Sequence, residues 1–269
     1  MTDAIANILS IAGSDPSGGA GIQADLKTFA ARRTYGMAVL TALTAQNTQG
    51  VSGVHPVPPA FVAAQIADVF SDVRVDAVKI GMIASAQIAE AVASALSPHR
   101  RVPVVLDPVM VAKGGASLLA REAVEALTGR LLPLATVLTP NLPEAAALLG
   151  EPEATDRAGM EDQARRLRAL GPKAVLLKGG HLPGSESPDV LATAEGAFWF
   201  EGVRILTRNT HGTGCSLSSA IAAELGKGRG LADAVAAAKG FIAGAVRHSD
   251  RLAVGSGHGP LHHFHALWD

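Results

Sequence analysis

A glycine-rich segment ends in the only cysteine of the sequence. It reads NTHGTGC over residues 209–215 and stands directly before an apolar helical stretch. Gly212 and Gly214 free the backbone on either side of Thr213, so that successive N–H groups can converge where the helix start adds partial positive charge. This arrangement suits a phosphoryl group in transfer, and we expect it to lower the pKa of the Cys215 thiol. The alternative is a glycine-rich helix start with a buried, inert cysteine.

A second glycine-rich segment, GSDPSGGAG at residues 13–21, follows the first apolar run. Its glycines allow the backbone to approach a ligand closely, and the helix expected after it points its amide end into the same space. The segment has neither the lysine and hydroxyl residue that close a P-loop nor the glycine spacing of a dinucleotide site. It predicts either a different kind of ligand site or an ordinary glycine turn.

Four polar residues stand where predicted strands end. Asn141 and Glu144 are three residues apart at a helix start, where an amide and a carboxylate on one face could hold water on Mg²⁺. Asp107 is a further candidate for ordering metal and phosphates, and Lys178 could reach a nucleotide phosphate as a point charge. Helix capping by Asn141 and a surface position for Lys178 are the alternatives.

Short apolar runs that alternate with longer amphipathic stretches predict an α/β fold. The runs at 8–12, 37–45, 77–80, 102–106, 136–138 and 174–177 are typical of buried strands, and those at 22–31, 59–70, 84–96, 121–132 and 160–170 of helices. Strands at 189–194, 197–200 and 203–206 predict an antiparallel edge, followed by helices at 214–225 and 231–249. In a mostly parallel central sheet, ligands bind beyond the carboxyl ends of the strands, where the polar residues above are expected to meet.

The overall composition excludes several classes of protein. The 269 residues are 48% hydrophobic and 17% charged, with a net charge of -1, so there is ample core material and no basic surface for nucleic acid or an anionic membrane. We find no signal sequence, no membrane-spanning run and no long linker. One cysteine fits a reducing compartment. We therefore expect a soluble, cytoplasmic protein with a single domain over residues 1–269.

The order of the motifs resembles hydroxymethylpyrimidine/phosphomethylpyrimidine kinase over essentially the whole chain. The resemblance is carried by AGSDPSGGAGIQAD (12–25), TAQNT (44–48), KIGM (79–82), DPVM (107–110), TPNLPE (139–144), KGGH (178–181) and NTHGTGC (209–215). It implies a ribokinase-like three-layer sandwich, ATP and Mg²⁺ as cofactors, and a homodimer. It also implies two reactions of thiamine biosynthesis, in which 4-amino-5-hydroxymethyl-2-methylpyrimidine is phosphorylated to its monophosphate and then to the pyrophosphate.

The same resemblance implies which residues contact the substrate. The family's pyrimidine contacts match Ala20, Gln46, Met82 and Val109. The amide of Gln46 has both a donor and an acceptor for an aminopyrimidine edge, and Met82 and Val109 offer apolar contact to the ring. Asp25 lies one helical turn beyond the glycine loop and is expected to position polar groups of the substrate.

Sugar kinases of this superfamily carry Gly-x-Gly-Asp, with the aspartate as general base, whereas this sequence has Cys215 at that place. We interpret Cys215 as the base that takes the alcohol proton, since a thiol has a pKa near ~8.5 before any shift. The alternative is that Cys215 acts mainly within the anion hole, because positioning and charge neutralisation dominate a loose phosphoryl-transfer transition state.

Two other functions compete with the pyrimidine kinase. Pyridoxal or pyridoxamine kinase is the nearer one, because related enzymes share the fold and the Gly-Thr-Gly-Cys ending; Gln46 favours the pyrimidine. The second is a non-catalytic nucleotide-binding regulator. The intact set of Asn141, Glu144, Lys178 and Cys215 argues against it, since a protein that only binds has no need of phosphoryl-transfer groups.

Overall fold

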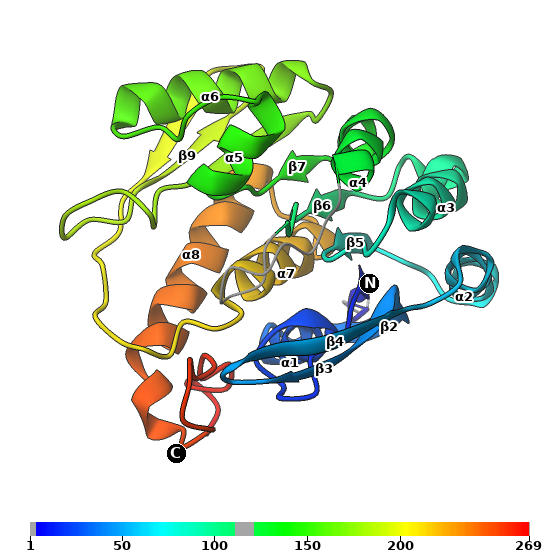
Figure 1. The fold of residues 1–269 in the computed structure, drawn as a ribbon, viewed down its shortest axis with the longest axis horizontal. Helices are drawn as coiled ribbons and strands as arrows, with labels where there is room; N and C mark the ends of the chain where they lie inside the picture. Colours follow the sequence, from blue (N-terminus) through cyan, green and yellow to red (C-terminus); the bar gives the residue numbers. More distant parts are fainter. Residues whose placement is uncertain (1–3, 111–120, 269) are drawn as a thin grey trace.

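One eight-stranded sheet forms the centre of the fold, which the computed structural model describes for residues 4–110 and 121–268 (Figure 1). The described residues form these strands, of which β3 and β4 lie outside the central sheet: β1 (Asn7–Ala12), β2 (Tyr35–Leu40), β3 (Ala42–Asn47), β4 (Gly50–Pro56), β5 (Ala77–Ile80), β6 (Val104–Leu106), β7 (Val137–Leu138), β8 (Ala174–Lys178), β9 (Asp189–Ala192) and β10 (Ala197–Phe200). The sheet order is β10-β9-β8-β7-β6-β5-β1-β2. The strands from β8 to β2 are parallel, and β9 and β10 are antiparallel. The predicted mostly parallel sheet with an antiparallel edge is confirmed.

Helices cover both faces of this sheet. They are α1 (Gly21–Ala31), α2 (Pro59–Asp72), α3 (Ala86–Leu96), α4 (Arg121–Ala126), α5 (Leu142–Leu149), α6 (Arg157–Ala169), α7 (Thr213–Gly226) and α8 (Leu231–Arg247). Leu9 and Ile11 of β1 enter the core beneath α2 to α6, whereas Ile8 faces the core beneath α1, α7 and α8. Because side chains alternate across a strand, a uniformly apolar strand serves both cores. The result is the predicted three-layer sandwich (Figure 1).

The prediction of one continuous strand over 37–45 is wrong. The chain leaves the sheet at Thr41, which is fully buried; its hydroxyl donates to the carbonyl of Met82 at 2.7 Å and its amide to that of Ala12 at 3.0 Å. Beyond this point β3 pairs with β4 in a separate hairpin, which Figure 1 shows beside α1. The sequence did not predict β4, because its residues are largely exposed and form no apolar run.

The predicted strand at 203–206 is also absent. Val203 makes one isolated bridge to Glu186, and its side chain and that of Leu206 are 80% and 90% exposed. The segment is held instead by the Arg204 guanidinium, which donates to the carbonyls of Gly180, Leu182, Gly184 and Glu186. An arginine that binds loop carbonyls replaces the strand hydrogen bonds that the apolar pattern predicted.

The predicted helix at 121–132 is regular only as far as Ala126. It continues as a π-helical turn, Leu127–Leu131, in which the N–H of Leu132 donates to the carbonyl of Leu127, and then as a 3₁₀ turn, Leu132–Leu134. Among the helices of residues 4–110 and 121–268, none is long and apolar enough to cross a lipid bilayer.

Candidate active site

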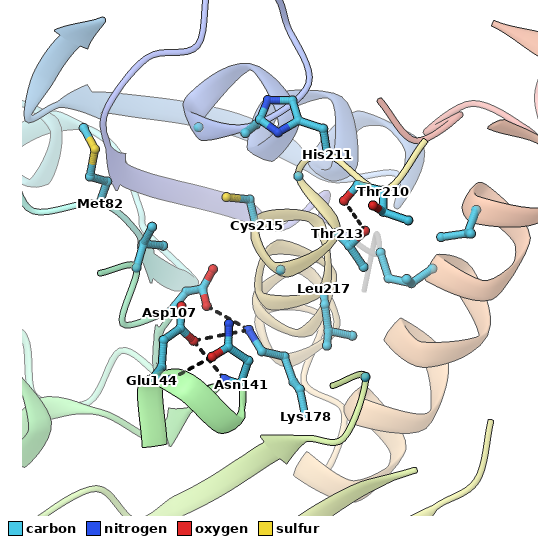
Figure 2. Close-up of a pocket in the computed structure, with 18 of the residues that line it drawn as sticks. Met82, Asp107, Asn141, Glu144, Lys178, Thr210, His211, Thr213, Cys215 and Leu217 are labelled. Atoms are coloured by element: carbon cyan, nitrogen blue, oxygen red, sulfur yellow. Dashed lines mark hydrogen bonds and ion pairs between the residues drawn. The ribbon is translucent and has the colours of Figure 1, made fainter. Parts of the chain in front are cut away.

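A cavity of about 780 Å³ opens at the carboxyl ends of the parallel strands. Twelve of the thirteen residues predicted for the site line it: Ala20, Gln46, Met82, Asp107, Val109, Asn141, Glu144, Lys178, Gly212, Thr213, Gly214 and Cys215. Figure 2 shows Cys215 between two groups of them, with Met82 and His211 on one side and the polar cluster around Lys178 on the other. Parallel topology brings several of them together, because Met82, Asp107 and Asn141 follow β5, β6 and β7 to the same edge of the sheet.

Helix α7 begins at the point where the two sides of the cavity meet. Gly212 is its N-cap and has a φ of 78°, and a Cβ atom there would collide with the carbonyl oxygen of Gly19. A Cβ atom on Gly214 would lie 3.3 Å from Lys178 Nζ and 3.6 Å from Asp107 Oδ2. The first amides of the helix, which have no partner within it, therefore stand beside a buried cation on the cavity wall.

Cys215 lies in the first turn of α7, but its thiol does not have the lowered pKa that we expected from the sequence. Burial raises the pKa of Cys215 to about 11, and the nearby Lys79 ammonium and a hydrogen bond from the backbone N–H of Gly21 only partly offset this rise. Desolvation disfavours the thiolate more than the helix start favours it. The sequence correctly predicted that a helix begins here. It did not predict that the surrounding residues shield the sulfur from solvent, which raises the pKa of the thiol.

Lys79 and Asp25 form an ion pair below the thiol, and both side chains are fully buried. The ammonium is 2.9 and 2.8 Å from the two carboxylate oxygens, which also accept from Ser10 Oγ at 2.6 Å and Ser219 Oγ at 2.7 Å. Protein donors thus satisfy the carboxylate, and Asp25 lies beneath the cavity and not on its wall. This corrects the expectation that Asp25 contacts the substrate.

Sequence reasoning assigned no role to Lys79, although the signal was present. Its charge interrupts the apolar run of β5, AVKI, where a lysine is expected only if it has a buried partner. Burial lowers the pKa of Lys79, but the Asp25 carboxylate more than offsets this and the pKa lies above its ordinary value. A permanent positive charge therefore lies under the thiol.

A second charged group lies at the ends of β6, β7 and β8. Lys178 Nζ is 3.2 Å from Asp107 Oδ1 and 3.9 Å from Glu144 Oε2 (Figure 2). Burial lowers the pKa of Lys178, but both carboxylates more than compensate, so the ammonium is retained. Burial also raises the pKa of Glu144 to about 7, despite the opposing charge of Lys178. The group joins two carboxylates and one cation within reach of the start of α7.

Asn141 has the capping role that was the alternative to metal binding. Its Oδ1 accepts from the N–H of Glu144 at 2.8 Å, and Glu144 Oε2 accepts from the N–H of Asn141 at 2.8 Å, which completes a capping box for α5. In the part of the chain that the structure describes, no three His, Cys, Asp or Glu side chains are grouped to hold a metal ion on their own. Mg²⁺ usually takes one or two carboxylates plus substrate phosphates, so Asp107 and Glu144 fit that requirement.

The other side of the cavity is bounded by the β3–β4 hairpin and the loop after β1. Gln46 and Thr44 of β3 line it, together with Met82. A Cβ atom on Gly13 would collide with the end of the Met82 side chain, so the glycine loop gives this methionine its place. Gln46 lies next to an irregularity in the β3–β4 register, between Ala45 and Gln46. An amide and an apolar side chain therefore face the same space.

Asp15 and His211 form a buried pair that sequence reasoning did not select. His211 Nε2 lies 2.7 Å from Asp15 Oδ2 and 3.3 Å from Gln46 Nε2. Burial raises the pKa of Asp15, but hydrogen bonds from His211, Ser17 and the Ala20 amide outweigh it and lower the pKa to about 2. Both residues were present in the quoted motifs, but only the fold brings the two glycine-rich loops together.

The cavity also has an apolar wall on the side of Lys178, which the sequence did not predict. It is formed by Leu217 of α7 and by Ile242, Ala243 and Val246 of α8. Helical periodicity predicts an apolar face for α8, but it does not distinguish core residues from residues that line a site.

Comparisons with known proteins agree with this geometry. A family model described as phosphomethylpyrimidine kinase matches residues 15–262. Hydroxymethylpyrimidine/phosphomethylpyrimidine kinase of Escherichia coli is 55% identical over 97% of this chain and 98% of its own length, and the thiamine biosynthesis bifunctional protein ThiED of Geobacter sulfurreducens is 54% identical over 98% of this chain and 53% of its own. An ADP complex of Bacillus subtilis pyridoxal kinase superimposes with a TM-score of 0.89 at 38% identity and covers 98% of this chain and 99% of that one.

The structural likeness confirms the predicted ribokinase-like fold, and the sequence likeness confirms the predicted family. Both extend over nearly the whole chain, and the family model includes all the residues predicted for the site. The chain is a kinase and belongs to the phosphomethylpyrimidine kinase family.

Proposed function

We propose that this kinase transfers the terminal phosphoryl group of ATP to the alcohol of 4-amino-5-hydroxymethyl-2-methylpyrimidine, and then phosphorylates the monophosphate to the pyrophosphate, in thiamine biosynthesis. The names of its relatives support this reaction. The observation that carries the proposal is that Gln46 and Lys178 line one cavity. Gln46 lies 3.3 Å from His211, and Figure 2 shows His211 and Lys178 on opposite sides of Cys215. A ring bound at Gln46 and a nucleotide bound at Lys178 place their reacting groups at the Thr213–Cys215 turn.

The nucleotide side supplies charge and an apolar surface. Lys178 binds the phosphates as a point charge, and the amides at the start of α7, that of Gly214 among them, donate to the oxygens of the phosphoryl group as it moves. We expect the adenine ring of ATP to bind against the apolar wall of Leu217, Ile242 and Val246. Phosphoryl transfer relies mainly on positioning and charge neutralisation, and these groups provide both.

Asp107 and Glu144 are the proposed ligands for Mg²⁺. Their carboxylates lie 3.2 and 3.9 Å from the same ammonium, that of Lys178, so the two carboxylates are close to each other at one end of the cavity. When bound, the ion neutralises triphosphate charge during transfer. The residues of this chain hold it and keep Lys178 in position, and Asn141 contributes by fixing the start of α5.

Cys215 is the proposed acceptor of the alcohol proton. The alcohol oxygen forms a bond to the terminal phosphorus, the bond from that phosphorus to the ADP oxygen breaks, and the alcohol proton passes to the sulfur. Lys79 and the Gly21 amide favour the thiolate that this step needs. With its pKa at about 11, only a small fraction of Cys215 is thiolate at neutral pH, and the proton passes to the sulfur in that fraction alone.

Pyrimidine recognition falls to Gln46, Met82, Val109 and Ala20, which all line the cavity. The amide of Gln46 offers an acceptor and a donor to the aminopyrimidine edge. The second candidate, pyridoxal kinase, is favoured by the structural likeness to the Bacillus subtilis enzyme. Steady-state kinetics with ATP and each alcohol separate the two: we expect a higher kcat/KM for the pyrimidine, and a higher value for pyridoxal would reverse the assignment.

Three broader expectations also remain proposals. Strands from both ends of the chain lie in one sheet, which supports a single domain over residues 1–269. A cytoplasmic location fits a partly buried free thiol that must stay reduced. The exposed apolar side chains Tyr35, Leu43, Val54 and Phe61 support a homodimer through the hairpin side, which light scattering tests directly.

A further inference from the structure

The carboxylate of Asp15 accepts four hydrogen bonds from Ser17, Gly19 and Ala20. Its Oδ1 accepts from the N–H and hydroxyl of Ser17 at 2.9 and 2.6 Å, and its Oδ2 accepts from the amides of Gly19 at 3.2 Å and Ala20 at 2.8 Å. Backbone amides can only donate, and the side chain is 1% exposed. Asp15 is therefore a carboxylate and carries no proton that it could offer to a neighbour.

The proton between Asp15 and His211 consequently belongs to the imidazole. His211 Nε2 is 2.7 Å from Asp15 Oδ2, a distance that requires a hydrogen on the nitrogen. This holds for the neutral ring and for the imidazolium, because both can carry a hydrogen on Nε2. The ring is also fixed in place: its backbone N–H donates to Gly259 at 3.0 Å, and a Cβ atom on Gly19 would collide with it. Nε2 has no lone pair left and its one hydrogen points at Asp15, so the Gln46 atom 3.3 Å away can take only a weaker, shared bond from that hydrogen.

The hydroxyl of Thr44, in contrast, can only accept a hydrogen bond from Gln46. It donates its one hydrogen to the carbonyl of Ser14 at 3.0 Å and has only lone pairs left for Gln46. The structure places Gln46 Nε2 3.3 Å from His211 Nε2 and Gln46 Oε1 3.3 Å from Thr44 Oγ1, so a donor faces a donor and an acceptor faces an acceptor. The oxygen and nitrogen of an amide are distinguished only by such partners. A half-turn of the amide makes its nitrogen a donor to Thr44 Oγ1 and places its oxygen beside the His211 N–H, whose main acceptor is Asp15.

We propose that Asp15, His211 and Thr44 fix the polarity of the Gln46 amide, with its oxygen toward His211 and its nitrogen toward Thr44, and so act as specificity-determining positioning residues. One lone pair of the oxygen and one hydrogen of the nitrogen remain for a ligand. This role rests on the proposed function: an aminopyrimidine edge then binds with its amino group on the His211 side and its ring nitrogen on the Thr44 side. Because the ring can then bind in one orientation only, its hydroxymethyl group points in one direction.

The fixed amide discriminates against a ring with the reversed pattern. The 4-oxo analogue of the substrate has an acceptor in place of the amino group and an N–H in place of the ring nitrogen. Its binding requires the amide to turn, which restores a donor–donor contact at His211 and an acceptor–acceptor contact at Thr44. Unpaired polar groups in such a site reject a ligand strongly, so we expect the wild type to prefer the amino compound by roughly 100-fold or more in kcat/KM.

A Thr44→Val variant with a matched Thr44→Ser control tests this role. Valine removes the acceptor, whereas serine keeps the hydroxyl. We expect Thr44→Val to reduce the preference for the amino over the 4-oxo compound by about tenfold, through a lower kcat/KM for the amino compound, and Thr44→Ser to restore it. An unchanged preference in Thr44→Val, or an equal loss in both variants, would overturn the proposal.

Neutron diffraction of the ligand-free, deuterium-exchanged protein tests the amide without any substrate. We expect deuterium on His211 Nε2 and on the Gln46 atom that faces Thr44. Deuterium on the Gln46 atom that faces His211 would overturn the inference even if the pyrimidine is phosphorylated. The expected map together with no turnover of the pyrimidine would instead refute the proposed function and leave the amide polarity standing.

Discussion

The pKa of Cys215 allows the chemistry of the site to be tested with one titration. Burial raises the pKa of this thiol from its ordinary value of 9.0 to about 11. At pH 8 the folded protein then has about 0.1% thiolate, against roughly a tenth for a free thiol, because each unit is a factor of ten. Since the sequence has no other cysteine, iodoacetamide reports on Cys215 alone.

We expect the alkylation rate of the folded protein to rise about tenfold per pH unit from pH 7 to pH 10, without a plateau. The urea-unfolded protein serves as the control, and its rate should level off near pH 9. Removing the cation with Lys79→Met should move the folded titration to still higher pH; Lys79→Met/Asp25→Asn is the companion variant that leaves no unpaired buried charge. A plateau of the wild-type rate near pH 7 would refute the reasoning, because it would mean that the helix start outweighs burial.

The same shift predicts how stability depends on pH. The folded state holds the thiol proton more tightly than the unfolded state, so the stabilisation is fully present below about pH 9 and is lost as pH rises toward 11. Two pKa units correspond to about 3 kcal/mol. Urea unfolding should therefore show the wild type losing about 3 kcal/mol relative to Cys215→Ala over this range. Parallel pH profiles for the two proteins would contradict the raised pKa.

Three other substitutions test separate parts of the site. Lys178→Met removes a charge-assisted contact to phosphate and should lower kcat/KM for ATP about tenfold to hundredfold in a coupled assay; an unchanged value would exclude Lys178 from nucleotide binding. Glu144→Gln keeps an oxygen for the capping box, so the thermal midpoint should hold while the Mg²⁺ concentration for half-maximal rate rises at least about tenfold; equal Mg²⁺ curves would remove Glu144 as a ligand. Asp25→Ala leaves Lys79 buried without a partner and should reduce the free energy of unfolding by about 3–5 kcal/mol, and a loss below about 1 kcal/mol would contradict the buried pair.

The fold was largely predictable because its strands are buried on both faces. Strands such as β6 and β7 are continuous apolar runs, and the motifs with glycine and asparagine follow strands. The parallel order then brings those motifs to one edge without further information. The hairpin was not predictable in the same way, since β4 is exposed and Thr41 ends β2 through a contact with Met82 that lies far away in the sequence.

The site was predictable as a set of residues but not as an electrostatic environment. The glycine spacing before Cys215 correctly indicated a helix start, yet the pKa of the thiol depends on enclosure by residues from other strands and helices. Asp25 and Lys79 lie 54 positions apart, and Asp15 and His211 lie 196 apart, so no local pattern pairs them. A lysine within the apolar run of β5 was the one local sign that a buried carboxylate must lie nearby.

The central claim is that one cavity brings the alcohol of the pyrimidine and the terminal phosphate of ATP together at the Thr213–Cys215 turn. A crystal structure with the hydroxymethylpyrimidine, Mg²⁺ and a non-hydrolysable ATP analogue tests it most directly. We predict the ring edge on Gln46, the terminal phosphate beside Lys178, and the alcohol oxygen between that phosphate and Cys215 Sγ. A ring bound away from Gln46, or a terminal phosphate separated from the alcohol by protein, would contradict the account.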